Sequence, residues 1–323
     1  MKILVIGAAG MVGKKLLHKI LSDNIMPISE LILYDIVAAL PPTTEIPTKI
    51  FSGDISKLDQ SLLLAQEKPD IIYHLASIVS GEAEENFTKG WDTNTSGTWQ
   101  LLDELRKLNE ASNGGYKPRF IFTSSIAVFG APFPHKINDE FLCAPQTSYG
   151  AQKAITEMLI SDYSRKEFID GLSIRLPTIC VRPGKPNLAA SSFFSGIIRE
   201  PLNKMEAILP VSDQVRHWHA SPRSAAQFLS HAGEMDLTQL GSRRSLNMPG
   251  VSCTVEEQIE SLRKIAGNDV VARIKHELDP RIIKIVDGWP RNFDTVRADS
   301  LGFKSESTFS EIINVYLEDD FEK

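Results

Sequence analysis

The 323-residue sequence predicts an α/β fold in which helices cover both faces of a doubly wound parallel sheet. Short apolar runs alternate with helical segments through the first half of the chain, as in a parallel sheet with crossover helices. The first apolar run, residues 3–6, leads directly into glycines spaced three apart and then into a helix. A strand, a tight turn and a helix N-terminus in this order can bind an anion such as a phosphate.

The glycine turn and the next strand predict a dinucleotide cofactor. The residues of the turn are Gly7, Gly10, Met11, Val12 and Gly13. The second apolar run ends at Asp35, roughly 20 positions after the turn, the spacing at which a carboxylate meets the adenosine ribose. Because a carboxylate accepts hydrogen bonds from ribose hydroxyls and repels a 2′-phosphate, the pattern predicts NAD rather than NADP.

The third and fourth strands add further residues to the same crevice. A strand is expected near residues 49–55, a short helix near 57–67, and a fourth strand near 70–75. Residues at the carboxyl ends of parallel strands line the ligand crevice. The cofactor contacts predicted from these strand ends are Asp54, Ile55, Leu75, Ala76 and Ser77.

A helix is expected over residues 87–109 and a fifth strand over 119–125. Within the helix, Asn94 is followed by a glycine three positions later, and both residue types lower helix stability, which indicates a polar role or a close approach there. The fifth strand ends in two hydroxyls, Ser124 and Ser125.

A strong amphipathic helix begins at residue 148 and precedes a sixth strand at 171–176. Tyr149 and Lys153 are four positions apart in this helix and therefore share one face. A lysine ammonium favours the phenolate form of a nearby tyrosine, which would then act as a general base. With a serine hydroxyl facing the same crevice, the three groups could remove a proton from an alcohol. Alone, the tyrosine–lysine spacing is weak and equally describes a solvated helix face.

Beyond Pro177 the regular alternation ends, and prolines punctuate shorter segments. The expected elements are helices at 191–199, 222–233, 254–266 and 308–316 and strands at 215–219 and 282–286. We predict an NAD-binding domain over residues 1–176, rejoined by about 211–248. Residues 177–210 and 249–323 are expected to form a smaller C-terminal α/β region that binds substrate.

Composition argues against several classes of function. A net charge of −6 disfavours binding to nucleic acid or to an anionic membrane, because both require a basic surface. No apolar run is long enough to span a bilayer, and the start of the chain is not a signal peptide. Three widely spaced cysteines suit a reducing compartment, so a cytoplasmic location is expected. His217 and His219 would share one face of a strand, but no third ligand lies nearby in sequence, and no metal site is predicted.

Several of these motifs occur in the order found in extended short-chain dehydrogenases/reductases, the group that includes NAD-dependent sugar-nucleotide epimerases and dehydratases, and the first 175 or so residues resemble that family. The resemblance implies a Rossmann domain with Tyr149 as the catalytic acid/base and Lys153 bound to the nicotinamide ribose. It implies that Ser124 polarises the substrate oxygen, although the neighbouring Ser125 is equally placed to do so. It also implies that Asn94 supports the lysine through a proton relay and that Pro177 contacts the cofactor.

The second half departs from the epimerases, because the asparagine that meets a nucleotide diphosphate is replaced in the stretch from Arg175 to Thr178. The later motifs are Val181-Arg-Pro-Gly184, Ser191-Ser-Phe-Phe194, His217-Trp-His-Ala-Ser-Pro222 and Trp289-Pro-Arg291. They resemble the branch that oxidises the 2-hydroxyl of a four-carbon sugar acid, D-erythronate, with NAD. A small acid needs a cation, and arginine recognises carboxylates well. The candidate substrate residues are Arg182 and Arg216 for the carboxylate and Asn187 and Ser191 for hydroxyls.

The resemblance also implies a homodimer formed through the helices at 87–109 and 149–168. Two other functions stay open at this point. One is an NAD-dependent nucleotide-sugar epimerase or dehydratase, and the other is a non-catalytic dinucleotide-sensing protein.

Overall fold

The computed structural model describes residues 1–185 and 189–321. Within these residues, a seven-stranded parallel sheet has the order β10-β6-β5-β4-β1-β2-β3. Its strands are β1 (Lys2–Ile6), β2 (Glu30–Asp35), β3 (Thr48–Ser52), β4 (Ile71–His74), β5 (Arg119–Ser125), β6 (Asp170–Leu176) and β10 (Ser245–Asn247). This sheet confirms the predicted fold class. The third strand ends at Ser52, so it is shorter than expected and stops before Asp54.

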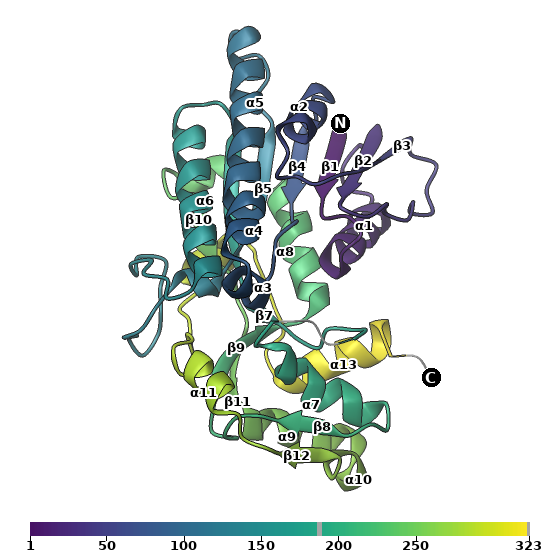
Figure 1. Cartoon of the computed structure of the whole chain (residues 1–323). Helices are drawn as coiled ribbons and strands as arrows, with labels where there is room; N and C mark the ends of the chain where they lie inside the picture. The colour runs from purple at the N-terminus through teal and green to yellow at the C-terminus, as the bar shows by residue number, and fades with distance from the viewer. Residues whose placement is uncertain (186–188, 322–323) are drawn as a thin grey trace.

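Helices cover both faces of this sheet, because its strands carry apolar side chains on both sides. On one face lie α1 (Met11–Asp23) and α8 (Pro222–Glu234), which pack against each other and against alternate residues of β1 and β2. On the other face lie α2 (Leu58–Gln66), α5 (Gly97–Ala111) and α6 (Ser148–Arg165). Figure 1 shows α5 and α6 side by side in front of the sheet.

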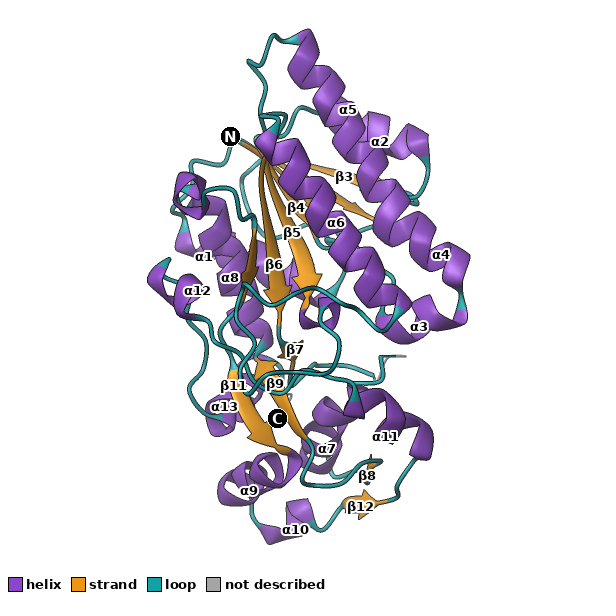
Figure 2. Ribbon diagram, turned by 90° about the vertical axis from the view of Figure 1, so that its left-hand side faces the viewer, coloured by secondary structure: helices purple, strands orange, loops and turns teal. Residues whose placement is uncertain are grey.

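A second lobe lies beyond the carboxyl ends of the sheet, and the arrowheads of β5 and β6 point toward it (Figure 2). In the described part of the chain this lobe holds two small sheets, β11-β9-β7 and β12-β8. Its strands are β7 (Thr178–Ile179), β8 (Ala207–Leu209), β9 (Arg216–Ala220), β11 (Val251–Thr254) and β12 (Ile274–His276). Its helices are α7 (Ser192–Leu202), α9 (Val255–Ala266), α10 (Asn268–Val271), α11 (Pro280–Asp287) and α13 (Phe309–Asp319). The chain leaves the large sheet at β6, enters this lobe at β7, and returns to the sheet at β10.

The remaining elements are short and pack mainly against the large lobe. They are α3 (Ser80–Glu85), α4 (Phe87–Trp91), α12 (Val296–Ser300) and two 3₁₀ turns, η2 (Ile126–Val128) and η3 (Leu237–Leu240).

The strand expected at residues 282–286 is wrong, because this segment lies in helix α11. The Asp279 side chain accepts a hydrogen bond from the Arg281 N–H, and Pro280 occupies the first turn, where its missing N–H costs nothing. Val286 is buried against the second lobe, whereas Lys284 and Ile285 are exposed. The β-branched residues suggested a strand, but the cap and the proline determine a helix.

The single helix expected at residues 87–109 is interrupted. Between α4 and α5 the chain forms η1 (Asp92–Ser96), a π-helical turn that contains Asn94. Gly97 begins α5, and a side chain there would meet Ile55 O at 2.6 Å, so the backbones touch. The predicted polar role and close approach therefore both occur here, and the wider turn is typical of functional sites.

Candidate active site

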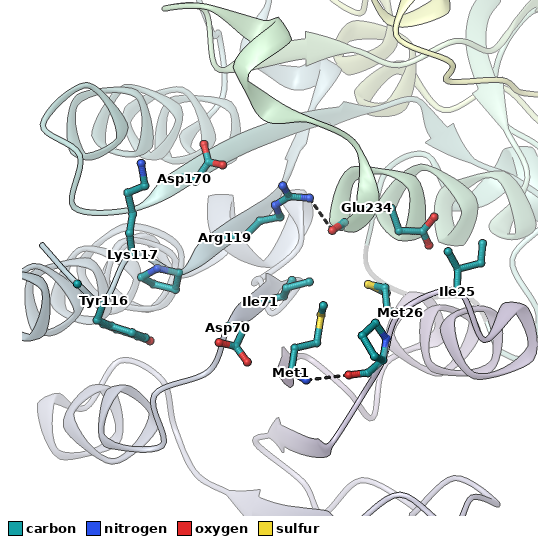
Figure 3. A pocket seen from close by; sticks show the side chains of 14 residues that line it. Met1, Ile25, Met26, Asp70, Ile71, Tyr116, Lys117, Arg119, Asp170 and Glu234 are labelled. Carbon is teal, nitrogen blue, oxygen red and sulfur yellow. Dashed lines mark hydrogen bonds between the residues drawn. The ribbon is translucent and has the colours of Figure 1, made fainter.

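A cavity of about 760 Å³ lies between the carboxyl ends of the strands and the second lobe. Most of the predicted site residues line it: Gly7, Gly10, Met11, Val12, Gly13, Leu75, Ser77, Ser124, Ser125, Tyr149, Lys153, Pro177, Arg182 and Ser191. Another cavity, of about 610 Å³, opens at the opposite ends of β1, β4, β5 and β6 (Figure 3). There the N-terminal amine of Met1 donates to Pro27 O and Arg119 donates to Gly233 O. Since ligands of such sheets bind at the carboxyl ends of the strands, the larger cavity is the candidate active site.

The glycine turn fits the pyrophosphate of NAD. Gly7 has a φ of +95°, and a side chain there would meet Ala76 N at 2.7 Å. A side chain at Gly13 would meet Gly7 O at 2.3 Å, so only glycine packs at both positions. Helix α1 begins at Met11, and the N–H groups of its first turn have no intrahelical acceptors. These groups face a cavity that the turn itself helps to line, and they are suited to an anion.

Asp35 ends β2 beside this turn, where the adenosine ribose of NAD would lie. Its Oδ2 accepts a hydrogen bond from Ala9 N at 2.9 Å, and its Oδ1 accepts one from Ile36 N at 2.7 Å. These bonds fix the carboxylate next to the glycine turn. The Asp35 side chain and the predicted contacts at Asp54, Ile55 and Ala76 do not line the cavity. Ile55 is buried in the core, and Ala76 packs against that same core.

Asn94 connects the loop after β4 to helix α6. Its Oδ1 accepts from Ser77 Oγ at 2.9 Å and from Ile78 N at 2.8 Å. Its Nδ2 donates to Ile78 O at 3.0 Å and to Gln152 Oε1 at 2.7 Å. These four bonds use the full hydrogen-bonding capacity of the amide. Asn94 therefore holds Ser77 in the cavity wall and makes no direct bond to Lys153.

Tyr149 and Lys153 lie together, as their spacing predicts, but their electrostatics differ from expectation. The Lys153 Nζ is 5.6 Å from the centre of the Tyr149 ring and donates to Thr123 O at 2.8 Å. Burial lowers the pKa of Lys153 to about 7, and the Glu157 carboxylate opposes this shift. Burial also raises the pKa of Tyr149 to about 12, against hydrogen bonds from Ser125 and Ser77. In this state desolvation outweighs any attraction between the two groups.

The two serines at the end of β5 have different surroundings. Ser125 is partly exposed and lines the cavity together with Tyr149, and its hydroxyl acts to lower the pKa of that tyrosine. Ser124 is only 2% exposed, and its hydroxyl donates to Glu157 Oε1 at 2.5 Å. The geometry thus favours Ser125 over Ser124 as the hydroxyl that meets a ligand beside Tyr149.

The substrate end of the cavity contains one of the two predicted arginines. Arg182 lines it and donates to Ser191 Oγ at 3.2 Å, and it forms no ion pair with an acidic side chain among the described residues. Arg216 does not line the cavity. It bonds to Ser252 O and pairs with Glu257 at 3.1 Å, because β9 runs beside β11 and places it opposite Thr254. Asn187 lies outside the described residues.

The predicted histidine pair does share one face of β9, but both rings pack against Phe194. Residues 1–185 and 189–321 contain no group of three side chains placed to hold a metal ion. His217 also lines the cavity, together with Thr178, Lys284 and Trp289. These four residues were not predicted as site residues. Two of them had a signal in the sequence: Thr178 directly follows Pro177, and His217 was considered only as a possible metal ligand.

Comparisons with known proteins identify the family of this chain. Residues 3–221 match the family described as NAD dependent epimerase/dehydratase family. A D-erythronate dehydrogenase from Haemophilus influenzae is 41% identical over 323 residues, covering 99% of this chain and 100% of the relative. A D-erythronate dehydrogenase from Cupriavidus necator is 42% identical, covering 99% of this chain and 98% of the relative.

Solved structures show the same fold. A nucleoside-diphosphate-sugar epimerase from Agrobacterium tumefaciens matches with a TM-score of 0.95 and 52% identity, covering 99% of this chain and 94% of the other. A Thermus thermophilus UDP-glucose 4-epimerase in complex with NAD matches with a TM-score of 0.75 and 18% identity, covering 99% of this chain and 100% of the other. The second likeness bears on the fold alone.

Proposed function

The chain belongs to the NAD dependent epimerase/dehydratase family, and we propose that it oxidises the 2-hydroxyl of D-erythronate, giving 2-dehydro-D-erythronate, with NAD as the cofactor. One observation carries the choice of a small acid: Arg182 offers a cation to the cavity and forms no ion pair with a described acidic side chain. A guanidinium beside a serine hydroxyl suits a carboxylate. The names of the two curated relatives support the same substrate.

The residues that would hold NAD are those of the glycine turn, Asp35 and the groups around Lys153. The turn and the start of α1 would bind the pyrophosphate, and Asp35 the adenosine ribose. Lys153 and Pro177 lie at the other end of the cavity, where the nicotinamide ribose would be. When bound, NAD supplies an acceptor for the hydride that leaves C2.

Tyr149 would take the proton of the 2-hydroxyl while the carbonyl forms at C2. Ser125 would donate a hydrogen bond to the substrate oxygen and hold it against Tyr149. A positive charge near Tyr149 favours its phenolate form. Lys153 supplies that charge when it is protonated. If this buried ammonium loses its proton, the phenolate of Tyr149 is less favoured.

The test is a panel of four- and five-carbon aldonic acids with NAD and NADP, followed by the absorbance of the reduced cofactor. We expect reduction of NAD with D-erythronate and a loss of about 10²-fold or more in kcat for Tyr149→Phe. Turnover of a nucleotide sugar, with no reduction of NAD by any four-carbon acid, would refute the proposal.

The name of the Agrobacterium structure favours a second candidate, a nucleotide-sugar epimerase. Such an enzyme regenerates its NAD in each cycle, so the same absorbance assay would show no net reduction. A dinucleotide sensor would show neither activity. The presence of Tyr149 and Lys153 in one cavity argues against a sensor.

We further propose that the protein is a homodimer. Apolar side chains on α5 and α6 are exposed: Trp99 by 48%, Ile155 by 37% and Met158 by 66%. Sedimentation of the protein and of a Trp99→Glu, Met158→Glu variant tests this, and a dimer that persists in the variant would argue against it. We also propose that residues 1–176 form the NAD-binding domain, rejoined by about 211–248. Within that second range α8 and β10 pack on the large sheet, whereas β9 lies in the second lobe. No helix in the described ranges could cross a membrane, and three free cysteines support a cytoplasmic location.

A further inference from the structure

Two side chains on the second-lobe wall of the cavity form a hydrogen-bonded pair. Thr178 begins β7, directly after the chain leaves the large sheet, and His217 lies on the neighbouring strand β9. Both side chains line the active-site cavity, on the same wall as Arg182. Thr178 Oγ1 and His217 Nε2 are 2.7 Å apart.

The other ring nitrogen of His217 determines which group of this pair donates. His217 Nδ1 is 2.9 Å from Pro290 O. A peptide carbonyl can only accept a hydrogen bond, so Nδ1 carries a proton. In a neutral imidazole with its proton on Nδ1, Nε2 is an acceptor. The Thr178 hydroxyl therefore donates its proton to His217.

The surroundings of His217 keep its ring neutral. The side chain is 2% exposed and stacks on Phe194, with ring centres 5.2 Å apart and planes 4° from parallel. Trp289 packs against it with ring centres 5.1 Å apart. Burial among these rings lowers the pKa of His217 to about 4. At neutral pH the assignment of one donor and one acceptor nitrogen holds.

We propose that Thr178 determines substrate specificity by accepting a hydrogen bond from a substrate hydroxyl beyond C2. Because its own proton is bound by His217, Thr178 presents only oxygen lone pairs to the cavity. A ligand hydroxyl can donate to these lone pairs, whereas a methylene leaves them unpaired, which costs binding energy. Pro290, His217 and Thr178 thus act as a fixed chain that selects a polyhydroxy acid over a simple 2-hydroxy acid. This inference rests on the proposed function, since it assumes an acid bound near Arg182.

The test compares Thr178→Val with Thr178→Ser on two acids. Valine keeps the shape of threonine without its hydroxyl, and serine keeps the hydroxyl as the matched control. The acids are D-erythronate and 2-hydroxybutanoate of the same configuration at C2, which lacks both distal hydroxyls. We expect Thr178→Val to lower kcat/KM for D-erythronate by about tenfold or more. The ratio of kcat/KM between the two acids should fall by the same factor, and Thr178→Ser should restore it.

Equal losses on both acids, or no loss with D-erythronate, would overturn the inference. The proposed function fails in a different way, because wild-type protein would then not reduce NAD with D-erythronate. If the proposed function fails, a measurement that needs no substrate can still test the state of His217. In the nitrogen NMR spectrum of protein with ¹⁵N-labelled histidine, His217 should carry its proton on Nδ1, and a proton on Nε2 would overturn the inference whatever the substrate.

Discussion

Glu157 and Arg175 form a doubly hydrogen-bonded ion pair directly behind the end of β5. Arg175 Nη2 donates to Glu157 Oε2 at 2.7 Å, and Arg175 Nε donates to Oε1 at 3.0 Å. Both side chains are less than a tenth exposed. The same carboxylate accepts the Ser124 hydroxyl, so the pair anchors one serine in the interior while its neighbour faces the cavity.

Loss of the arginine should destabilise the protein strongly. Arg175→Met leaves the Glu157 carboxylate buried without its cation, and we expect the free energy of unfolding to fall by about 3–5 kcal/mol. Urea denaturation measures this change. Arg165→Met is the control, because it removes an exposed pair with Asp162 worth at most about 1 kcal/mol. Similar losses in the two variants would contradict the role given to the buried pair.

Substitution of Ser125 and substitution of Ser124 should have different effects on kcat. Ser125→Ala removes the hydroxyl beside Tyr149, and we expect kcat for the acid substrate to fall by about 10²-fold. Ser124→Ala removes only a donor to Glu157 and should keep most of kcat, with a lower free energy of unfolding. If Ser124→Ala lowers kcat more than Ser125→Ala does, Ser124 is the serine that contacts the substrate oxygen, as the family resemblance implies, and the assignment of Ser125 is wrong.

Arg182 and Arg216 offer a matched pair of substitutions. Arg182→Met removes the cavity cation, and we expect KM for the acid to rise by about tenfold or more, since a charged hydrogen bond is lost. KM for NAD should change little. Arg216→Met alters a partly exposed ion pair outside the cavity and serves as the control. A larger effect from Arg216→Met would place the carboxylate elsewhere.

Asp35 should set the choice of cofactor. Asp35→Ala removes the acceptor for the ribose hydroxyls and the repulsion of a 2′-phosphate, so the ratio of kcat/KM for NAD over NADP should fall by about tenfold or more. Asp54 accepts a hydrogen bond from Ser56 N, whereas Asp35 accepts one from Ala9 N of the glycine turn, so Asp54→Ala should leave this ratio unaltered. A wild-type preference for NADP would refute the role of Asp35.

His74 makes stability depend on pH. Burial lowers its pKa to about 3, below the ordinary value of 6.5 that it has in the unfolded chain. Between these values the unfolded state binds more protons, so the free energy of unfolding falls as the pH falls below 6.5. His74→Gln removes this titration and keeps a partner for Thr98. The loss of stability between pH 7 and pH 5, measured in urea, should shrink by about 2 kcal/mol. Identical pH dependence in both proteins would contradict this.

The large sheet could be predicted because each of its strands is a short apolar run before a turn. The sequence patterns that led to wrong predictions are weaker, or they depend on residues distant in the chain. The run at residues 282–286 is rich in β-branched residues, but Asp279 and Pro280 begin a helix. In that case a local cap outweighed side-chain propensity.

The site could be predicted wherever spacing alone determines geometry, as for Tyr149 and Lys153. It could not be predicted where partners are distant in sequence. Ser124 and Ser125 are equivalent candidates in the sequence, but in the fold only Ser124 donates a hydrogen bond to Glu157. In the sequence Arg216 is as good a carboxylate-binding candidate as Arg182, but the pairing of β9 with β11 places Arg216 outside the cavity. The neutral state of His217 also depends on the rings of Phe194 and Trp289, which come from two other segments of the chain.

The late return of the chain to the large sheet has a consequence for synthesis on the ribosome. β6 is complete once residue 176 has been made, but its outer neighbour is β10, which ends at Asn247. Until then the edge of β6 has unpaired peptide groups, and such an edge invites pairing with another nascent chain. Only β7, α7, β8 and β9 of the second lobe are translated in that interval, together with α8, so a pause in translation between these points would prolong the period of greatest aggregation risk.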